Sequence, residues 1–336
     1  MNDSRPCLEC INTIFYRPFQ AMIGCQVFFA IASILSVTHF LLVFIRPSPL
    51  HRNFKTLLTI YFLNSILHSC IFLASVGSLF YRVFFYENAL DAFMDRNTYI
   101  ILHLLICFTL NVQILSEFLI CVERVIATIR VSKYENENSK LTLWMFFAII
   151  FFLPVAFIQW AYYDENFEQP QLFPLVAPIS AQQKINILFV IGMLFVVSAL
   201  IITFYTRYIN KRKKTIYQFR LTTRYQIAEN IVTSHIMSTV LFSNLFVTIF
   251  FTVSIMILRN LRDNDFVNQN LGFYSTIKLL VYPHHVAAVI IPMFSGCYLQ
   301  KLRQTRIESL TNMVTIQSNG KIASETYRTY LTRQWT

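Results

Sequence analysis

Seven long apolar runs dominate the sequence, and they constrain the fold more than any other feature. Each run is long enough, at about 1.5 Å per residue, to cross a hydrocarbon core of about 30 Å as a helix. Lipid offers the backbone no hydrogen-bond partners, so a run of this kind adopts a helix. The sequence therefore predicts an all-α fold, a polytopic membrane protein built as a bundle of seven transmembrane helices. The runs lie at 21–45, 56–80, 98–122, 141–160, 184–208, 227–258 and 273–298.

The composition excludes several other classes of protein. Hydrophobic residues make up 55% of the 336 residues and charged residues only 13%, more apolar surface than a soluble domain of this length buries easily. Only six glycines occur, so a glycine-rich phosphate-binding loop has too few residues to form, and we expect no nucleotide site and no other cofactor. The net charge of +11 does not indicate nucleic-acid binding, because the basic residues gather in short loops between the apolar runs.

Basic residues are divided unequally between the two sets of loops. Most of the 28 lysines and arginines lie in 46–55, 122–140 and 207–225 and in the tail that follows the last run. Loops rich in lysine and arginine remain on the cytoplasmic side of a membrane. The sequence therefore predicts an extracellular N-terminal tail (1–20), a transmembrane domain (21–298) and a cytoplasmic C-terminus.

The residues after the last run divide into two parts. Over 299–316, apolar residues recur near helical spacing while lysine and arginine take the other face. This pattern predicts an amphipathic juxtamembrane helix along the inner leaflet. Residues 317–336 are expected to form a disordered cytoplasmic tail.

The third run ends in two adjacent charged residues, Glu123 and Arg124. Charged side chains are unfavourable in lipid, so this pair should lie at a membrane face. Gln113, Glu117 and Arg124 fall on one helical stripe, which indicates that this stripe contacts other helices. The alternative is an arginine whose head group simply extends to the interface.

A basic segment that includes Arg224 precedes the sixth run. Beside a membrane, such a segment binds anionic lipid or docks an acidic cytosolic partner, and the sequence leaves both functions open. The sixth run then begins near Glu229, at the expected depth of Arg124. We expect Arg124 and Glu229 to form an ion pair that holds the inner ends of the third and sixth helices together.

Glu117 is predicted to be part of a buried polar switch. Its candidate partners are Asn64 in the second run and His284 or His285 in the last run. The alternative is a neutral Glu117 that is hydrogen-bonded to nearby backbone.

The last run carries the predicted ligand-binding residues. Lys278 lies between Tyr274 and Tyr282 on one helical face, and His103 lies in the outer half of the third run. A cation framed by aromatic rings would attract an anionic or carbonyl-bearing ligand into an otherwise apolar pocket. The alternative is a lysine that extends to the lipid headgroups.

Three short motifs carry a resemblance to a known family. They are H-x-N-x-K at His51, Asn53 and Lys55, E-R-x-x-A-T at Glu123, Arg124, Ala127 and Thr128, and R-Y-Q-x-x-E-N at Arg224, Tyr225, Gln226, Glu229 and Asn230. With these motifs the chain resembles the nematode serpentine chemoreceptors of the Sra superfamily (classes alpha, alpha-beta, beta and epsilon), with a leaning to class alpha-beta.

The resemblance implies a G-protein-coupled receptor with no catalytic activity. Its partners would be a small-molecule ligand, a heterotrimeric G protein and membrane lipids, and its location the plasma membrane at the sensory cilia of chemosensory neurons. The chain departs from the rhodopsin-like pattern, because 161–183 contains no cysteine and the last run reads VYPHHVAAVIIP where that group has N-P-x-x-Y. The rhodopsin-like activation switch therefore does not transfer residue by residue.

Other functions for a seven-helix protein fit the sequence less well. A ligand-gated channel of the insect odorant-receptor kind would have its N-terminus inside, which the charge distribution opposes. A transporter built from inverted repeats would have paired helix breaks, but Pro154, Pro283 and Pro292 do not pair across the two halves. Cys7 and Cys10 have the spacing of half a zinc site without a second pair, so we expect no metal, and a disulfide and two free thiols remain the alternatives.

Overall fold

The computed structural model describes residues 13–48, 50–85, 93–130, 140–168, 171–178, 180–216, 221–261 and 270–318. Within these ranges it contains helices and no strand, and seven stretches of helix are long and apolar enough to span a membrane. The predicted all-α, seven-helix fold is therefore confirmed. The helices are α2 (Arg17–Phe40) with its π-helical continuation η1 (Leu41–Ile45), α3 (Arg52–Phe85), α4 (Arg96–Ile129), α5 (Lys140–Tyr162), α6 (Gln182–Ile216), α7 (Leu221–Leu261), α9 (Leu271–Leu280) and α10 (His284–Ser318).

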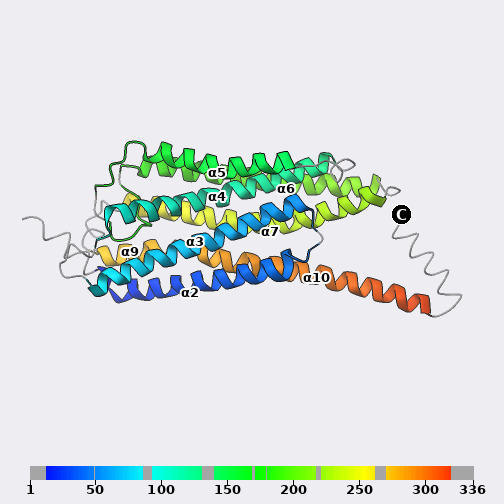
Figure 1. The fold of residues 1–336 in the computed structure, drawn as a ribbon, viewed down its shortest axis with the longest axis horizontal. Coiled ribbons are helices and arrows are strands. Elements are labelled where there is room, and N and C mark those ends of the chain that lie inside the picture. The colour runs from blue at the N-terminus through cyan, green and yellow to red at the C-terminus, as the bar shows by residue number, and fades with distance from the viewer. Residues whose placement is uncertain are drawn as a thin grey trace, which may run out of the picture.

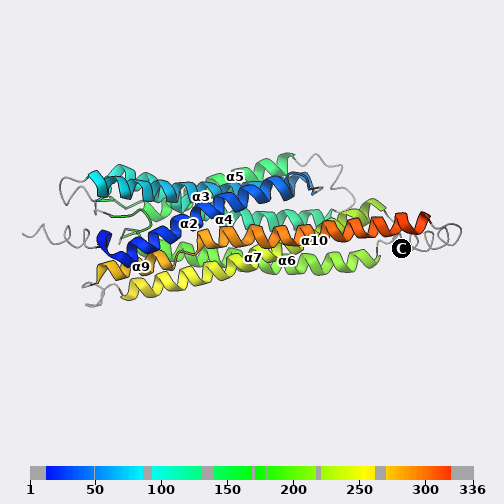
Figure 2. The ribbon, with the colours of Figure 1, turned by 90° about the horizontal axis from the view of Figure 1, so that it is seen from below.

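The helices form an elongated bundle around α4 (Figures 1 and 2). α4 begins at an aspartate cap, where the Asp95 carboxylate accepts hydrogen bonds from the backbone amides of Asn97 and Thr98. Along its length α4 packs against α3, α5, α6 and α7. Its buried side chains include Glu117, which is fully buried. The polar stripe of this helix faces neighbouring helices, as predicted.

The last membrane-spanning stretch is broken, although the sequence predicted one helix over 273–298. α9 ends at Leu280, and α10 begins at His284 after a link that contains Pro283. Proline has no backbone N–H, and it disfavours the helical conformation of the residue before it. Carbonyl groups at the break are bound from α2, where the Gln26 side-chain amide donates to Leu279 O (2.8 Å) and Tyr282 O (3.1 Å).

Residues 299–316 are helical, but they continue α10 to Ser318 and do not form a separate helix (Figure 1). Most of their side chains lie outside the described residues, so an amphipathic surface along the membrane stays a prediction. The predicted tail at 317–336 lies almost entirely outside the described ranges. The same is true of Cys7, Cys10 and most of the N-terminal tail.

Candidate functional site

A cavity of about 120 Å³ lies at the α9 end of the bundle. Side chains from α4, α6, α7 and α9 line it, together with the covering segment, residues 171–178. Most of the wall is apolar. The apolar side chains that line it include Ile106, Phe173, Phe189, Phe251 and Leu258.

The covering segment is attached to two helices, α3 and α4. The Leu172 carbonyl accepts from Arg82 (3.1 Å), and the Val176 carbonyl accepts from the Tyr99 hydroxyl (2.6 Å). Phe173, at the centre of the segment, is 5% exposed and packs edge-on against Phe72 of α3. The segment therefore forms a fixed wall of the cavity.

The structure brings three of the four predicted ligand-binding residues into the cavity wall: His103, Lys278 and Tyr282. Tyr274 does not line the cavity, and its contact with ligand stays a prediction. Tyr274 is buried, and its ring lies 4.4 Å from the Lys278 ammonium group. The periodicity placed Tyr274 and Lys278 on one face correctly, but the tyrosine supports the lysine instead of reaching the cavity.

His103 has both ring nitrogens occupied. Nδ1 lies 2.6 Å from the Pro174 carbonyl, and Nε2 lies 2.6 Å from the Tyr162 hydroxyl. A carbonyl oxygen only accepts, so Nδ1 carries the donated hydrogen, and in the neutral ring Nε2 accepts from the tyrosine. His103 therefore orients Tyr162 and the covering segment, and both of these also line the cavity.

Sequence reasoning missed Arg259, which lines the same cavity from α7. Its Nη1 donates to the Gln182 carbonyl (3.3 Å) and to the Asn186 side chain. The sixth apolar run was predicted to end at residue 258, which left this arginine in the loop. A helix one turn longer would have placed Arg259 near the depth of Lys278.

The buried carboxylate of Glu117 is bound by α7, not by the predicted partners. The Asn244 side-chain amide lies 2.8 Å from each carboxylate oxygen. Asn64 instead donates to the Thr109 carbonyl (2.8 Å) and to Gln113 (3.0 Å). The prediction named the wrong residues, because α4 turns this position toward Asn244 of α7, and in the second run it is Tyr61, not Asn64, that hydrogen-bonds the carboxyl group.

His284 lies against two aromatic rings, with its ring centroid 5.4 Å from that of Phe251 and 5.0 Å from that of Tyr282. Together with Asn64 and Asn244, it lines a second cavity of about 30 Å³. The predicted switch residues therefore lie near one another, but His284 has no recorded hydrogen bond to Glu117. Among the described residues, no group of three His, Cys, Asp or Glu side chains is arranged to hold a metal ion.

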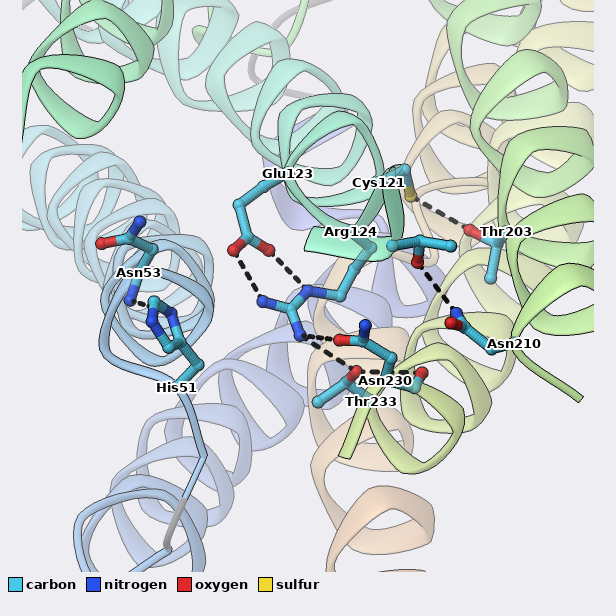
Figure 3. A network of polar contacts seen from close by, with 10 residues as sticks. His51, Asn53, Cys121, Glu123, Arg124, Thr203, Asn210, Asn230 and Thr233 are labelled. Carbon is cyan, nitrogen blue, oxygen red and sulfur yellow. Dashed lines mark hydrogen bonds and ion pairs between the residues drawn. The ribbon is translucent and has the colours of Figure 1, made fainter. Parts of the chain in front are cut away.

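The third cluster surrounds Arg124 at the opposite end of α4 (Figure 3). Arg124 is 3% exposed and forms a two-point ion pair with Glu123, Nε to Oε2 at 2.5 Å and Nη2 to Oε1 at 2.6 Å. Its Nη1 donates to Asn230 (3.2 Å) and Thr233 (3.3 Å) of α7, and its guanidinium lies 4.7 Å from the Phe54 ring of α3. The arginine therefore ties three helices together instead of extending to an interface.

Two further residues predicted for the inner end of the bundle, its G-protein-coupling and gate region, fall in α7, but their side chains lie outside the described residues. These residues are Arg224 and Glu229. The pairing of Arg124 with Glu229 therefore stays a prediction. The described contacts of Arg124 nevertheless reach the same helix, one residue beyond Glu229.

Comparison with known proteins decides the family. A model of the serpentine seven-transmembrane G-protein-coupled receptors, class ab chemoreceptors, matches residues 7–336. The chain belongs to this serpentine receptor family. It is also similar to Caenorhabditis elegans serpentine receptor class beta-16, with 31% identity over 98% of this chain and 96% of that protein. Serpentine receptor class beta-6 of the same species is 25% identical over 100% of this chain and 98% of that protein. The suspected superfamily is thus confirmed.

The serpentine receptor motifs come together around Arg124. His51 and Asn53 lie at the start of α3, and Asn230 lies on α7, on either side of the Glu123–Arg124 pair (Figure 3). The backbone N–H of Asn53 donates to His51 Nδ1 (3.4 Å) at the first turn of α3. Residues from three motifs far apart in the sequence therefore lie close together in this serpentine receptor (Figure 3).

Proposed function

We propose that this serpentine receptor detects a small-molecule chemical cue and signals to a heterotrimeric G protein. The observation that carries the proposal is the pairing of a mostly apolar cavity at one end of the bundle with the buried Arg124 cluster at the other. α4 and α7 contribute to both sites. Membership in a receptor family of chemosensory type supports the same function.

The proposed orientation places the cavity outside the cell and Arg124 at the cytoplasmic face. The basic loops at the Arg124 end support it, because such loops remain in the cytoplasm. The N-terminus would then be outside, with the receptor in the plasma membrane of sensory cilia. An epitope tag before Met1 should bind antibody on intact cells, and a tag after Thr336 should require permeabilised cells.

In the proposed mechanism, ligand changes how α4 and α7 pack. Both helices line the cavity. They are joined by the hydrogen bond from Asn244 of α7 to Glu117 of α4, and by the one from Arg124 of α4 to Asn230 of α7. A ligand that favours a different α4–α7 arrangement shifts the population toward it by its difference in affinity for the two states. Separation of the two helices at the Arg124 end would then expose a surface for the G protein.

The direct test is a signalling assay. Cells that express the receptor are exposed to candidate volatile and water-soluble cues, and second-messenger levels are measured with and without inactivation of the G protein. A cue-dependent response that disappears with the G protein is expected. A current that survives G-protein inactivation would favour a ligand-gated channel instead.

Replacing Glu229 by glutamine is expected to raise signalling in the absence of ligand. Loss of an ion pair at the α4–α7 contact removes about 0.2–1 kcal/mol from the resting arrangement, which shifts a two-state equilibrium up to several-fold. The measurement is basal second-messenger level at equal surface expression. An unchanged basal level in Glu229→Gln would show that Arg124 does not depend on this residue.

Replacing Lys278 by methionine is expected to weaken the response to ligand about tenfold, because a charge-assisted hydrogen bond from the cavity wall is lost. The measurement is the half-maximal cue concentration at matched surface expression. Lys184→Met is the control, since Lys184 lies outside this cavity and pairs with Asp164. Potency within twofold of the unmodified receptor in Lys278→Met would show that the lysine is an interfacial anchor.

A further inference from the structure

Two cationic side chains from different helices face the same cavity. Arg259 comes from α7 and Lys278 from α9, and both are half-buried. No aspartate or glutamate of the described part of the chain lines this cavity. The wall is therefore apolar with a positive charge on two of its sides.

Arg259 is anchored by one edge of its guanidinium. Nη1 donates to the Gln182 carbonyl and the Asn186 side chain, and the group lies 6.0 Å from the Phe189 ring. A guanidinium has five N–H donors, and among the described residues no partner is recorded for Nε or Nη2. The N–H groups on Nε and Nη2 of Arg259 thus keep the planar arrangement that binds a carboxylate at two points.

Two acidic residues after α5, Asp164 and Glu165, are occupied elsewhere. Glu165 accepts from the Phe167 amide (3.0 Å) and from Ser180, and Asp164 pairs with Lys184 (2.8 Å). They therefore do not neutralise Arg259. An anion in this low-dielectric space would gain charge-assisted hydrogen bonds from the remaining donors of Arg259 and from the Lys278 ammonium group across the cavity.

The size of the cavity limits the rest of the ligand. At about 120 Å³, it is slightly smaller than an engineered apolar cavity of about 150 Å³ that binds benzene. Phe189, Phe251 and Leu258 offer an apolar surface for one ring or a short chain. The occupant thus combines one negative charge with a small hydrocarbon part.

Resting on the proposed function, we propose that the cue is a small monocarboxylate whose carboxylate binds between Arg259 and Lys278 and whose hydrocarbon part fills the apolar half of the cavity. Such a ligand connects α7 to α9. Its affinity therefore depends on the distance between these two helices, which makes it selective for one arrangement of the bundle.

The experiment compares acids with their uncharged amides on purified receptor in lipid nanodiscs. The probes are butyrate, hexanoate and benzoate against butyramide, hexanamide and benzamide at pH 7, and the readout is the unfolding midpoint against probe concentration. At least one acid should bind at least about tenfold more tightly than its amide. In Arg259→Gln its dissociation constant should rise about 10- to 100-fold, the range expected for loss of charge-assisted hydrogen bonds.

Two further variants keep the result interpretable. Arg259→Lys retains the charge without the planar donors, and it should bind more weakly than the natural chain and more tightly than Arg259→Gln. Arg17→Gln removes an exposed cation from the same end of the bundle without touching the cavity, so affinity should stay within twofold. Amides that bind as tightly as acids, a complete absence of acid binding, or equal loss in Arg17→Gln would each overturn the proposal.

The outcomes also separate this inference from the proposed function. Acid binding that depends on Arg259, without any G-protein-dependent signal in cells, would support the site and contradict the signalling function. Signalling to neutral cues with equal potency in Arg259→Gln would support the function and overturn the carboxylate site.

Discussion

Replacing Glu123 by alanine is expected to lower the free energy of unfolding by about 3–5 kcal/mol. Glu123 is 1% exposed and supplies both oxygens of the two-point pair with Arg124. Its removal leaves a buried guanidinium without the adjacent carboxylate, while the neutral contacts to Asn230 and Thr233 remain. The measurement is thermal unfolding of receptor in nanodiscs, with ligand-free signalling recorded in parallel.

A second substitution distinguishes the cost of a stranded charge from a loss of packing. Glu123→Ala combined with Arg124→Met should be more stable than Glu123→Ala alone, because the uncompensated charge is then absent. Arg212→Gln is the control, since Arg212 is an exposed cation that lies over Tyr208 on α6, and its effect should stay within about 0.5 kcal/mol. Equal stability of the single and double variants would show that the pair contributes through packing.

Replacing Asn244 by leucine is expected to lower the free energy of unfolding by about 2–3 kcal/mol. The asparagine amide is bonded to both oxygens of Glu117, and that carboxyl group is completely buried. Hydrogen bonds to a charged or strongly polar buried group are worth about 1.5–3 kcal/mol, and the carboxyl group loses them without gaining contact with water. The measurement is the unfolding midpoint in nanodiscs, compared with surface expression in cells.

The matched double variant tests whether the loss comes from the unpaired carboxyl group. Glu117→Leu together with Asn244→Leu should recover part of the stability, because both members of the pair become apolar, whereas the buried Tyr61 hydroxyl loses Glu117 as a partner. Thr248→Val, one turn along α7, removes a buried hydroxyl without affecting Glu117 and should cost less. A double variant as unstable as Asn244→Leu would contradict the pairing as the source of the effect.

The helical fold could be predicted from sequence because length and apolar composition are sufficient to define a membrane-spanning helix. Local charge also identified the Glu123–Arg124 pair. Its two-point geometry could not be predicted, since adjacent residues on a helix do not face each other. The pair forms because both long side chains bend into the space among α3, α4 and α7, which only the packed bundle defines.

Two kinds of residue were not predicted: charged residues just beyond the boundary of an apolar run, and neutral polar residues inside one. Arg259 follows directly after the predicted end of its run, where an arginine ordinarily marks the interface. Asn244 carries no charge, and the periodicity of its own run does not say which helix it faces. Lys278 was identified because a lysine within an apolar run is rare. Charged residues inside an apolar run can thus be recognised from the sequence. Neutral polar residues inside a run, and charged residues at its boundary, cannot be recognised in the same way.

The Gln26 hydrogen bonds across the α9–α10 break have a consequence for how the chain is made. The break exposes carbonyl groups at Leu279 and Tyr282, and they are bound by a side chain about 250 residues earlier, on the first helix. A ribosome completes the first helix long before it completes the last, and lipid offers these carbonyls no substitute partner. These hydrogen bonds can therefore form only after the last helix has been inserted, when the first helix must still be accessible to it. A chain truncated before α9 would leave the Gln26 side-chain amide without these acceptors. The first helix would then lack its polar contacts with the last one, and the seven-helix bundle would stay incomplete.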